Sequence, residues 1–124
     1  MRISRTCLGV AAAAAALVAS GPAFAHARLV HSNPAKNAVV ASPKVITLTF
    51  DDELVPAFSS FTVTMPMGSQ SMNVAVKTHV DKDGKTITGI PSSRLAAGSY
   101  VVHWTATAKE DGHKMTGDVP FKVK

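Results

Sequence analysis

Apolar and polar residues alternate along most of the chain, and this pattern predicts short β-strands. Residues 45–50 place three apolar side chains on one face and two threonines on the other, which is typical of a half-buried strand. Residues 99–106 alternate in the same way, with Tyr100, Val102 and Trp104 on one face. The complete set of predicted strands comprises residues 28–31, 45–50, 61–65, 73–80, 85–90, 99–106 and 119–123.

Turn-forming residues separate these strands. Asp83-Gly84 is a common hairpin signal within an expected turn at 81–84. We expect polar loops at 66–71 and 109–114, and a connection at 91–98 with one helical turn at most. About seven short strands without a convincing helix indicate an all-β fold, a Greek-key β-barrel or sandwich with an immunoglobulin-like or cupredoxin-like shape.

The first 25 residues have the composition of a secretory leader. Arg2 and Arg5 form a positive segment, residues 8–18 are apolar and rich in alanine, and Ala23-Phe24-Ala25 fits a signal-peptidase site. The apolar run is too short for a membrane-spanning helix. We therefore predict a signal peptide at 1–25, cleaved after Ala25, and one small exported domain at 26–124.

The composition of the predicted domain restricts its chemistry. It keeps eleven basic and eight acidic residues, without the basic cluster that would indicate a nucleic-acid partner. The single cysteine, Cys7, belongs to the leader. Disulfides, blue-copper sites, zinc–thiolate sites and iron–sulfur clusters are thereby excluded from the domain. Any soft metal ligand must come from methionine.

Cleavage after Ala25 would make His26 the first residue, with a free amine and an imidazole that can chelate one metal ion. Asp111-Gly112-His113 supplies a carboxylate and a second imidazole, and Gly112 lets the backbone bend so that the two side chains converge. Three nitrogens and one oxygen suit square or tetragonal Cu(II), with zinc as the main competitor. The alternative is a solvated turn without metal. We assign His79 and His103 ordinary solvated or hydrogen-bonded positions on strands.

Methionines form a second candidate site. Met67 and Met72 flank a polar loop, and Met65 ends the strand before it. Thioethers at such positions select Cu(I) over harder ions. The alternative interpretation of Met65 is a flexible filler of the core.

The chain resembles the CopC family of periplasmic copper-resistance proteins over essentially all of 26–124. The resemblance is carried by His26-Ala27-Arg28-Leu29-Val30, Ser32-Asn33-Pro34-Ala35, Leu48-Thr49-Phe50-Asp51-Asp52-Glu53-Leu54, Gly98-Ser99-Tyr100-Val101-Val102-His103-Trp104, and Asp111-Gly112-His113 followed by Thr116-Gly117.

The resemblance implies a Greek-key β-barrel with a Cu(II) site near one end. Its ligands would be the amine and imidazole of His26, Asp111 and His113, with Glu53 as an acidic neighbour. Some family members also carry a methionine-rich loop that binds Cu(I). The loop of this chain is shorter and lacks histidine, with Gln70 near the place where one is expected.

The predicted function is a periplasmic carrier that sequesters Cu(II), and Cu(I) through Met65, Met67 and Met72, in copper resistance or homeostasis. Expected partners are copper ions and a copper-transporting inner-membrane protein or other periplasmic resistance proteins, and a monomer is expected. The first alternative is a histidine-brace copper redox enzyme, but Asp111 would occupy a coordination position that such chemistry leaves open. The second is a metal-free structural sandwich, which leaves the coincidence of His26 with the cleavage site unexplained.

Overall fold

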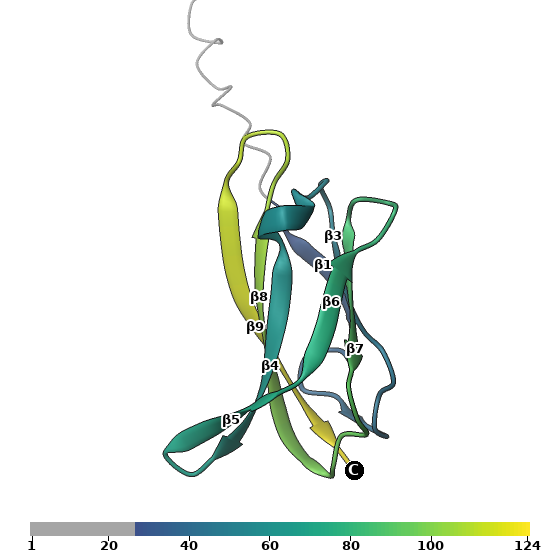
Figure 1. Ribbon diagram of the computed structural model, residues 1–124, viewed down its shortest axis with the longest axis vertical. Coiled ribbons are helices and arrows are strands. Elements are labelled where there is room, and N and C mark those ends of the chain that lie inside the picture. Colours follow the sequence, from purple (N-terminus) through teal and green to yellow (C-terminus); the bar gives the residue numbers. More distant parts are fainter. Residues whose placement is uncertain (1–26) are drawn as a thin grey trace, which may run out of the picture.

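The computed structural model describes residues 27–124, and the predicted leader and His26 lie outside that part of the chain. Two β-sheets pack face to face (Figure 1). The strand order is β1-β3-β7-β6 in the four-stranded sheet and β2-β9-β8-β4-β5 in the five-stranded sheet. The strands are β1 (Leu29–Asn33), β2 (Val39–Val40), β3 (Ile46–Phe50), β4 (Ser60–Met67), β5 (Gln70–Val74), β6 (Val76–Val80), β7 (Thr86–Pro91), β8 (Gly98–Thr107) and β9 (Lys114–Val123). The predicted all-β, two-sheet architecture is confirmed.

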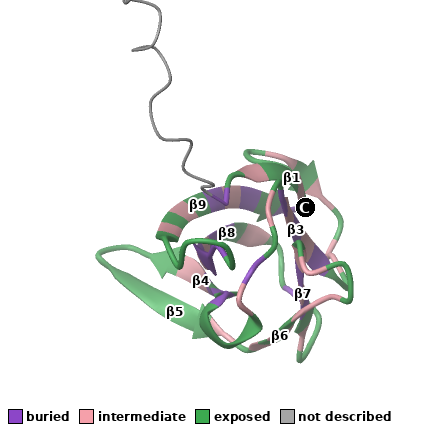
Figure 2. Cartoon of the chain, turned by 90° about the horizontal axis from the view of Figure 1, so that it is seen from above, coloured by how far each residue is buried: buried purple, intermediate pink, exposed green. Residues whose placement is uncertain are grey.

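The core lies between the sheets, where the apolar faces of the alternating strands meet (Figure 2). Ile46, Leu48 and Phe50 of β3 are all buried, whereas the threonines between them are half-buried. Phe50 meets Trp104 of β8 edge to face, with ring centroids 5.0 Å apart. Aromatic pairs in this geometry add stability beyond the area that they bury. The period-two pattern of the sequence therefore correctly predicts which face of each strand is buried in the core.

The structure differs from the predicted strands mainly around the methionines. The prediction of a loop at 66–71 is wrong, because most of these residues belong to β4 and β5, which pair with each other and leave only Gly68-Ser69 as a turn. The expected strand at 73–80 is divided at Ala75 into β5 and β6, which belong to different sheets. β9 is also longer than predicted, because pairing with β8 extends back to Lys114. Pairing partners, which a single segment does not reveal, account for all three differences.

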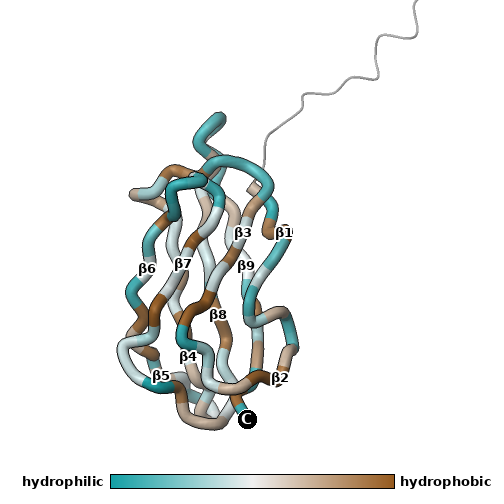
Figure 3. The backbone as a smooth tube through the Cα atoms, turned by 90° about the vertical axis from the view of Figure 1, so that its right-hand side faces the viewer, coloured by the Kyte–Doolittle hydropathy of each residue, from teal (hydrophilic) through white to brown (hydrophobic). Residues whose placement is uncertain are grey.

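The antiparallel registers place the connections at two opposite ends of the sandwich (Figure 3). One end, called the loop end below, carries residues 51–53, 81–85 and 108–113 and the start of the described chain. The other, called the methionine end, carries the Gly68-Ser69 turn, the connections at 34–45 and 92–97 and the last residues of the chain. No helix in residues 27–124 has the length and apolar character needed to cross a membrane.

Close packing of Trp104 against β9 depends on a glycine. Gly117 is the cross-strand partner of Trp104, and a Cβ built at Gly117 would lie 2.6 Å from Cε2 of the indole. Among the described residues, the buried indole Nε1 has no hydrogen-bond partner. Packing, not hydrogen bonding within this part of the chain, therefore fixes the ring.

We predict that Gly117→Ala lowers the free energy of unfolding by about 1–3 kcal/mol, because the added methyl group must displace the indole or the strand. Urea denaturation followed by tryptophan fluorescence measures the change. Thr116→Ala, at an exposed neighbouring position, is the matched control and should change stability by only about 0.5 kcal/mol. Equal stability of Gly117→Ala and wild type would contradict this account of the packing.

Candidate metal centre

The loop between β8 and β9 contains two of the predicted Cu(II) ligands, Asp111 and His113. Thr107 and Lys114 form the last cross-strand pair before the loop. The backbone N–H of Ala108 donates to the carbonyl of His113 at 2.9 Å, and that of Gly112 donates to the carbonyl of Ala108 at 2.9 Å. These bonds close residues 108–113 into a compact turn at the loop end.

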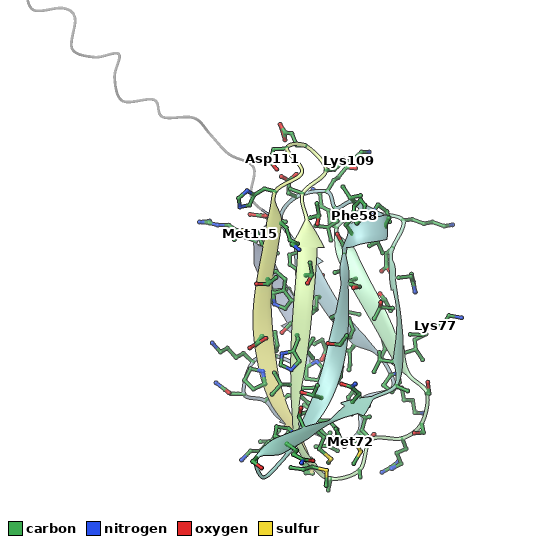
Figure 4. The ribbon with its side chains drawn as sticks, turned by 60° about the vertical axis from the view of Figure 1, so that its left-hand side comes forward. Phe58, Met72, Lys77, Lys109, Asp111 and Met115 are labelled. Atoms are coloured by element: carbon green, nitrogen blue, oxygen red, sulfur yellow. The ribbon has the colours of Figure 1, made fainter. Side chains whose placement is uncertain are left out.

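Asp111 and His113 are directly connected within this turn. The backbone N–H of His113 donates to Oδ1 of Asp111 at 2.9 Å, and Gly112 between them has a φ of +72°. Glycine adopts this left-handed backbone conformation more readily than residues with a Cβ. The predicted role of Gly112 in bending the loop is therefore confirmed. Both side chains are exposed, and Asp111 lies near the tip of the loop (Figure 4). Oδ2 of Asp111 retains acceptor capacity for a cation.

Glu53 lies beside the loop but is oriented toward other groups. Its carbonyl accepts a hydrogen bond from the N–H of Lys109 at 2.8 Å. Its Oε2 lies 3.7 Å from Nζ of Lys109 and 3.4 Å from an ideal Cβ built at Gly84. The ion pair is exposed on both sides, so it contributes little to stability. Glu53 therefore joins the loop to the turn at 81–85.

That turn is fixed by Asp83. Its carboxylate accepts hydrogen bonds from the N–H groups of Lys85 at 2.8 Å and Thr86 at 3.0 Å, and from the Thr86 hydroxyl at 2.8 Å. Hydrogen bonding to the Lys85 N–H, followed by the Thr86 hydroxyl, lowers the pKa of Asp83 below its ordinary value. Asp83 thus stays ionised and holds Gly84 against Glu53.

The beginning of the described chain is anchored at the same end. Ala27 is completely buried. The N–H of Arg28 donates to Oδ1 of Asp51 at 2.8 Å, and the N–H of Asp51 donates to the carbonyl of Arg28 at 3.0 Å. The sequence places Asp51 in a family motif but assigns it no role. Its position directly after the half-buried strand predicted at 45–50 was the available signal for a role in a neighbouring connection.

The described residues do not form a complete metal site. Within 27–124, no group of three or more His, Cys, Asp or Glu side chains is arranged to hold a metal ion. The structure brings Asp111 and His113 into one turn, with the backbone of Glu53 beside it. The third predicted ligand residue, His26, lies outside the described residues. A Cu(II) site with all predicted ligands therefore stays a prediction.

The three candidate Cu(I) ligands lie on one face of the β4–β5 hairpin. Met65 is directly opposite Met72, and Met67 is opposite Gln70. Directly opposite residues, and residues two apart on one strand, share a face, so all three thioethers project from the same side. Met67 and Met72 are each 52% exposed. Figure 4 shows Met72 at the end of the molecule opposite Asp111.

Met65 differs from the other two because it packs against the core. A Cβ built at Gly98 would lie 2.7 Å from its Cε, so the thioether covers this glycine. Part of the alternative interpretation of Met65 as a core filler is therefore correct. Met115, which follows the Asp-Gly-His turn, also packs against the core.

Two strand histidines, His103 and His79, have the hydrogen-bonded or solvated surroundings predicted for them. Nδ1 of His103 lies 2.9 Å from Oδ1 of Asp118, and its Nε2 lies 2.9 Å from the hydroxyl oxygen of Thr64. Nε2 of His79 lies 3.2 Å from Oδ1 of Asp81, and both side chains are exposed. These contacts explain His103 and His79 without a metal ion.

The chain belongs to the CopC domain family, whose model matches residues 29–124. This assignment rests on more than the shared two-sheet fold, because the matched region includes the Asp-Gly-His turn and nearly all of the described chain. The resemblance noted in the sequence is thereby confirmed.

Curated relatives give the same assignment. Copper resistance protein C of Pseudomonas syringae pv. tomato is 41% identical over 115 residues, which cover 90% of each chain. Copper resistance protein C of Xanthomonas campestris pv. juglandis is 39% identical over 114 residues, which cover 89% of each chain.

Solved structures agree with these relatives. PcoC, a methionine-rich copper resistance protein from Escherichia coli, superposes with a TM-score of 0.73 at 39% identity, covering 81% of this chain and 100% of PcoC. CopC from Methylosinus trichosporium OB3b gives a TM-score of 0.68 at 34% identity, covering 80% of this chain and 94% of that protein.

We predict that Gly112→Ala lowers the free energy of unfolding by about 1–2 kcal/mol, because a residue with a Cβ is strained in the left-handed conformation. Apart from the two neighbours of Gly112 in the chain, no atom of residues 27–124 lies within 4 Å of the added carbon, so the cost expected from this part of the chain comes from the backbone. Chemical denaturation measures it, with Glu110→Ala in the same exposed turn as control, expected within about 0.5 kcal/mol of wild type. A Gly112→Ala protein as stable as that control would contradict the assigned geometry.

Proposed function

We propose that this CopC-family protein is an exported copper-binding protein whose mature N-terminus completes a Cu(II) site with Asp111 and His113. The observation that carries the proposal is the common location of the Ala27–Arg28 anchor and the Asp-Gly-His turn. Arg28 is hydrogen-bonded to Asp51, and the carbonyl of Glu53 accepts from Lys109 in the turn. Two hydrogen-bonded contacts, joined by the short segment 51–53, thus connect the Ala27–Arg28 anchor to the ligand loop.

Covalent geometry strengthens this argument. His26 directly precedes Ala27, so its Cα is about 3.8 Å from that of Ala27 across a trans peptide. Ala27 is completely buried and Arg28 is held by Asp51 at both backbone groups. An N-terminal residue next to a rigid anchor loses less conformational freedom when it binds a metal than one on a free tail.

The donor set favours copper. Cleavage after Ala25 would give His26 a free α-amine, with a reference pKa of about 7.7–8.0, beside an imidazole with one of about 6.5. With the His113 imidazole and the Asp111 carboxylate, these make three nitrogens and one oxygen, a set that suits tetragonal Cu(II). Signal-peptide cleavage would then create the site, and the precursor would lack the chelating amine.

The methionine end supplies a second, softer donor set. Met65, Met67 and Met72 project from one face of the hairpin, and thioethers prefer Cu(I). The hairpin turn is only two residues long, and β4 and β5 contain no histidine. We therefore propose three sulfur donors for Cu(I), two of them half exposed and open to exchange with a partner.

A carrier fits this arrangement better than an enzyme. The Asp111 carboxylate would fill a position that a histidine-brace enzyme keeps open for oxygen, so activation of O₂ would be poor. The relatives described above are named copper resistance proteins. We propose a monomer in the periplasm that sequesters copper and exchanges it with other resistance proteins or an inner-membrane transporter.

Adding one alanine before His26 should weaken Cu(II) binding more than the roughly 10–100-fold typical of losing an outer-shell partner, because the extension removes the terminal amine from the chelate. Competition titration of the processed protein measures the affinity, EPR identifies a type 2 Cu(II) signal, and intact mass establishes the terminus. His113→Ala should have an effect of similar size.

His79→Ala is the matched control for these variants, because His79 pairs with Asp81 and not with a residue of the Asp-Gly-His turn. Its Cu(II) affinity should equal that of wild type. Tight binding by the alanine-extended protein would exclude the terminal amine as a ligand and remove the central claim.

Replacing Met65, Met67 and Met72 together by leucine should weaken Cu(I) binding at least about tenfold and leave Cu(II) binding unchanged, because only the thioethers are lost. Competition with a Cu(I) chelator under anaerobic conditions measures this. Met115→Leu, a thioether packed against the core at the other end, is the control. Unchanged Cu(I) affinity in the triple variant would eliminate the second site.

A further inference from the structure

Charge is distributed unequally between the two ends of the sandwich. Seven of the eight acidic residues lie in the connections of the loop end, and Asp118, within β9, is the eighth. The seven are Asp51, Asp52, Glu53, Asp81, Asp83, Glu110 and Asp111. The connections and chain end that form the methionine end contain no acidic residue among those described.

The methionine end carries exposed cations without carboxylates, whereas the loop end combines its seven carboxylates with the exposed cations Arg28, Lys82, Lys85 and Lys109. The cations of the methionine end come from separate parts of the chain: the segment before β3, the 92–97 connection, and the end of β9 with the C-terminus. All five are exposed: Lys36, Lys44, Arg94, Lys122 and Lys124. Lys77, on β6, lies between the two ends (Figure 4).

Exposed apolar side chains gather at the same end. Seven large hydrophobic residues of the described chain are exposed, and five of them belong to this end: Val39, Val45, Met67, Met72 and Ile90. Ile90 is 50% exposed and lines a surface hollow together with Lys44 and Arg94. The β4–β5 hairpin projects from this end (Figure 1).

We propose that the methionine end docks on the surface of an anionic phospholipid bilayer. Basic residues near an anionic membrane gain electrostatic attraction, and adjacent apolar side chains add binding by entering the interfacial region. Both features occur here without an acidic residue that would oppose approach. The acidic connections at the far end orient the molecule, because they are repelled while the basic end is attracted.

The spread of the cations favours a membrane over an acidic protein. Three chain segments contribute them around one end of the molecule, which a broad anionic surface can contact simultaneously. A single acidic peptide would instead be expected to meet a compact basic groove. Docking in this orientation turns the exposed Met67 and Met72 toward the bilayer and leaves Asp111 and His113 in solvent.

This inference does not depend on copper, so it is tested with the copper-free processed protein. The probes are vesicles of phosphatidylglycerol mixed with phosphatidylcholine, compared with phosphatidylcholine alone, and binding is measured by cosedimentation. Each basic residue near an anionic surface contributes about fivefold to binding. Lys44→Gln combined with Arg94→Gln should therefore weaken partitioning about 25-fold, and added salt should weaken it for wild type.

The matched control is Lys82→Gln combined with Lys85→Gln, which removes the same charge from exposed positions at the loop end. Its partitioning should stay within about twofold of wild type, because these side chains face away from the bilayer and their charges are screened over about 8 Å. Selective loss in the first variant supports docking through the methionine end. Equal loss in both variants would show a net-charge effect and overturn the proposal.

Two other outcomes would also overturn it. The first is a lack of preference for anionic vesicles, so that wild-type protein binds neither kind of vesicle or binds both equally. The second is binding to soluble polyglutamate, lost with Lys44→Gln and Arg94→Gln, without any binding to anionic vesicles; this would assign the surface to an acidic protein. Intact Cu(II) binding in the same preparations would separate each of these failures from a failure of the proposed copper site.

Discussion

Burial of one apolar face of each sheet is the constraint on which this structure depends. The described chain contains no cysteine, so no disulfide can hold residues 27–124 together, and contacts such as Phe50 against Trp104 must do so. A one-residue shift of a strand would turn its apolar side chains to solvent. The core therefore fixes the strand registers, and the registers fix where each connection lies.

Those connections give the two ends different chemistry. The loop end combines the Asp111–His113 turn with the anchored start of the described chain and most of the carboxylates. The methionine end combines thioethers, exposed apolar side chains and lysines. Harder nitrogen and oxygen donors suit Cu(II), whereas thioethers suit Cu(I). A rigid sandwich between the ends would keep the two proposed donor sets apart and prevent them from competing for one ion.

Several features were predictable because they depend on neighbours in sequence. The buried face of β3, the turn at 81–84 and the bend at Gly112 follow from alternation, an Asp-Gly pair and a glycine between two polar residues. The extension of β4 through Met67 was not predictable in this way. Proline and serine around residues 66–71 indicate a loop, but pairing with β5 overrides that local preference.

The sequence by itself determined the fold class and the residue types available for binding copper, and it predicts the leader, because periodicity, composition and motifs are local properties. Only the tertiary structure decided which of these residues share an end or a face. Asp51 holds Arg28 across 23 positions of sequence, and the register of β4 with β5 aligns Met65, Met67 and Met72. Such long-range hydrogen bonds and registers arise when the sheets pack, so a local pattern cannot specify them.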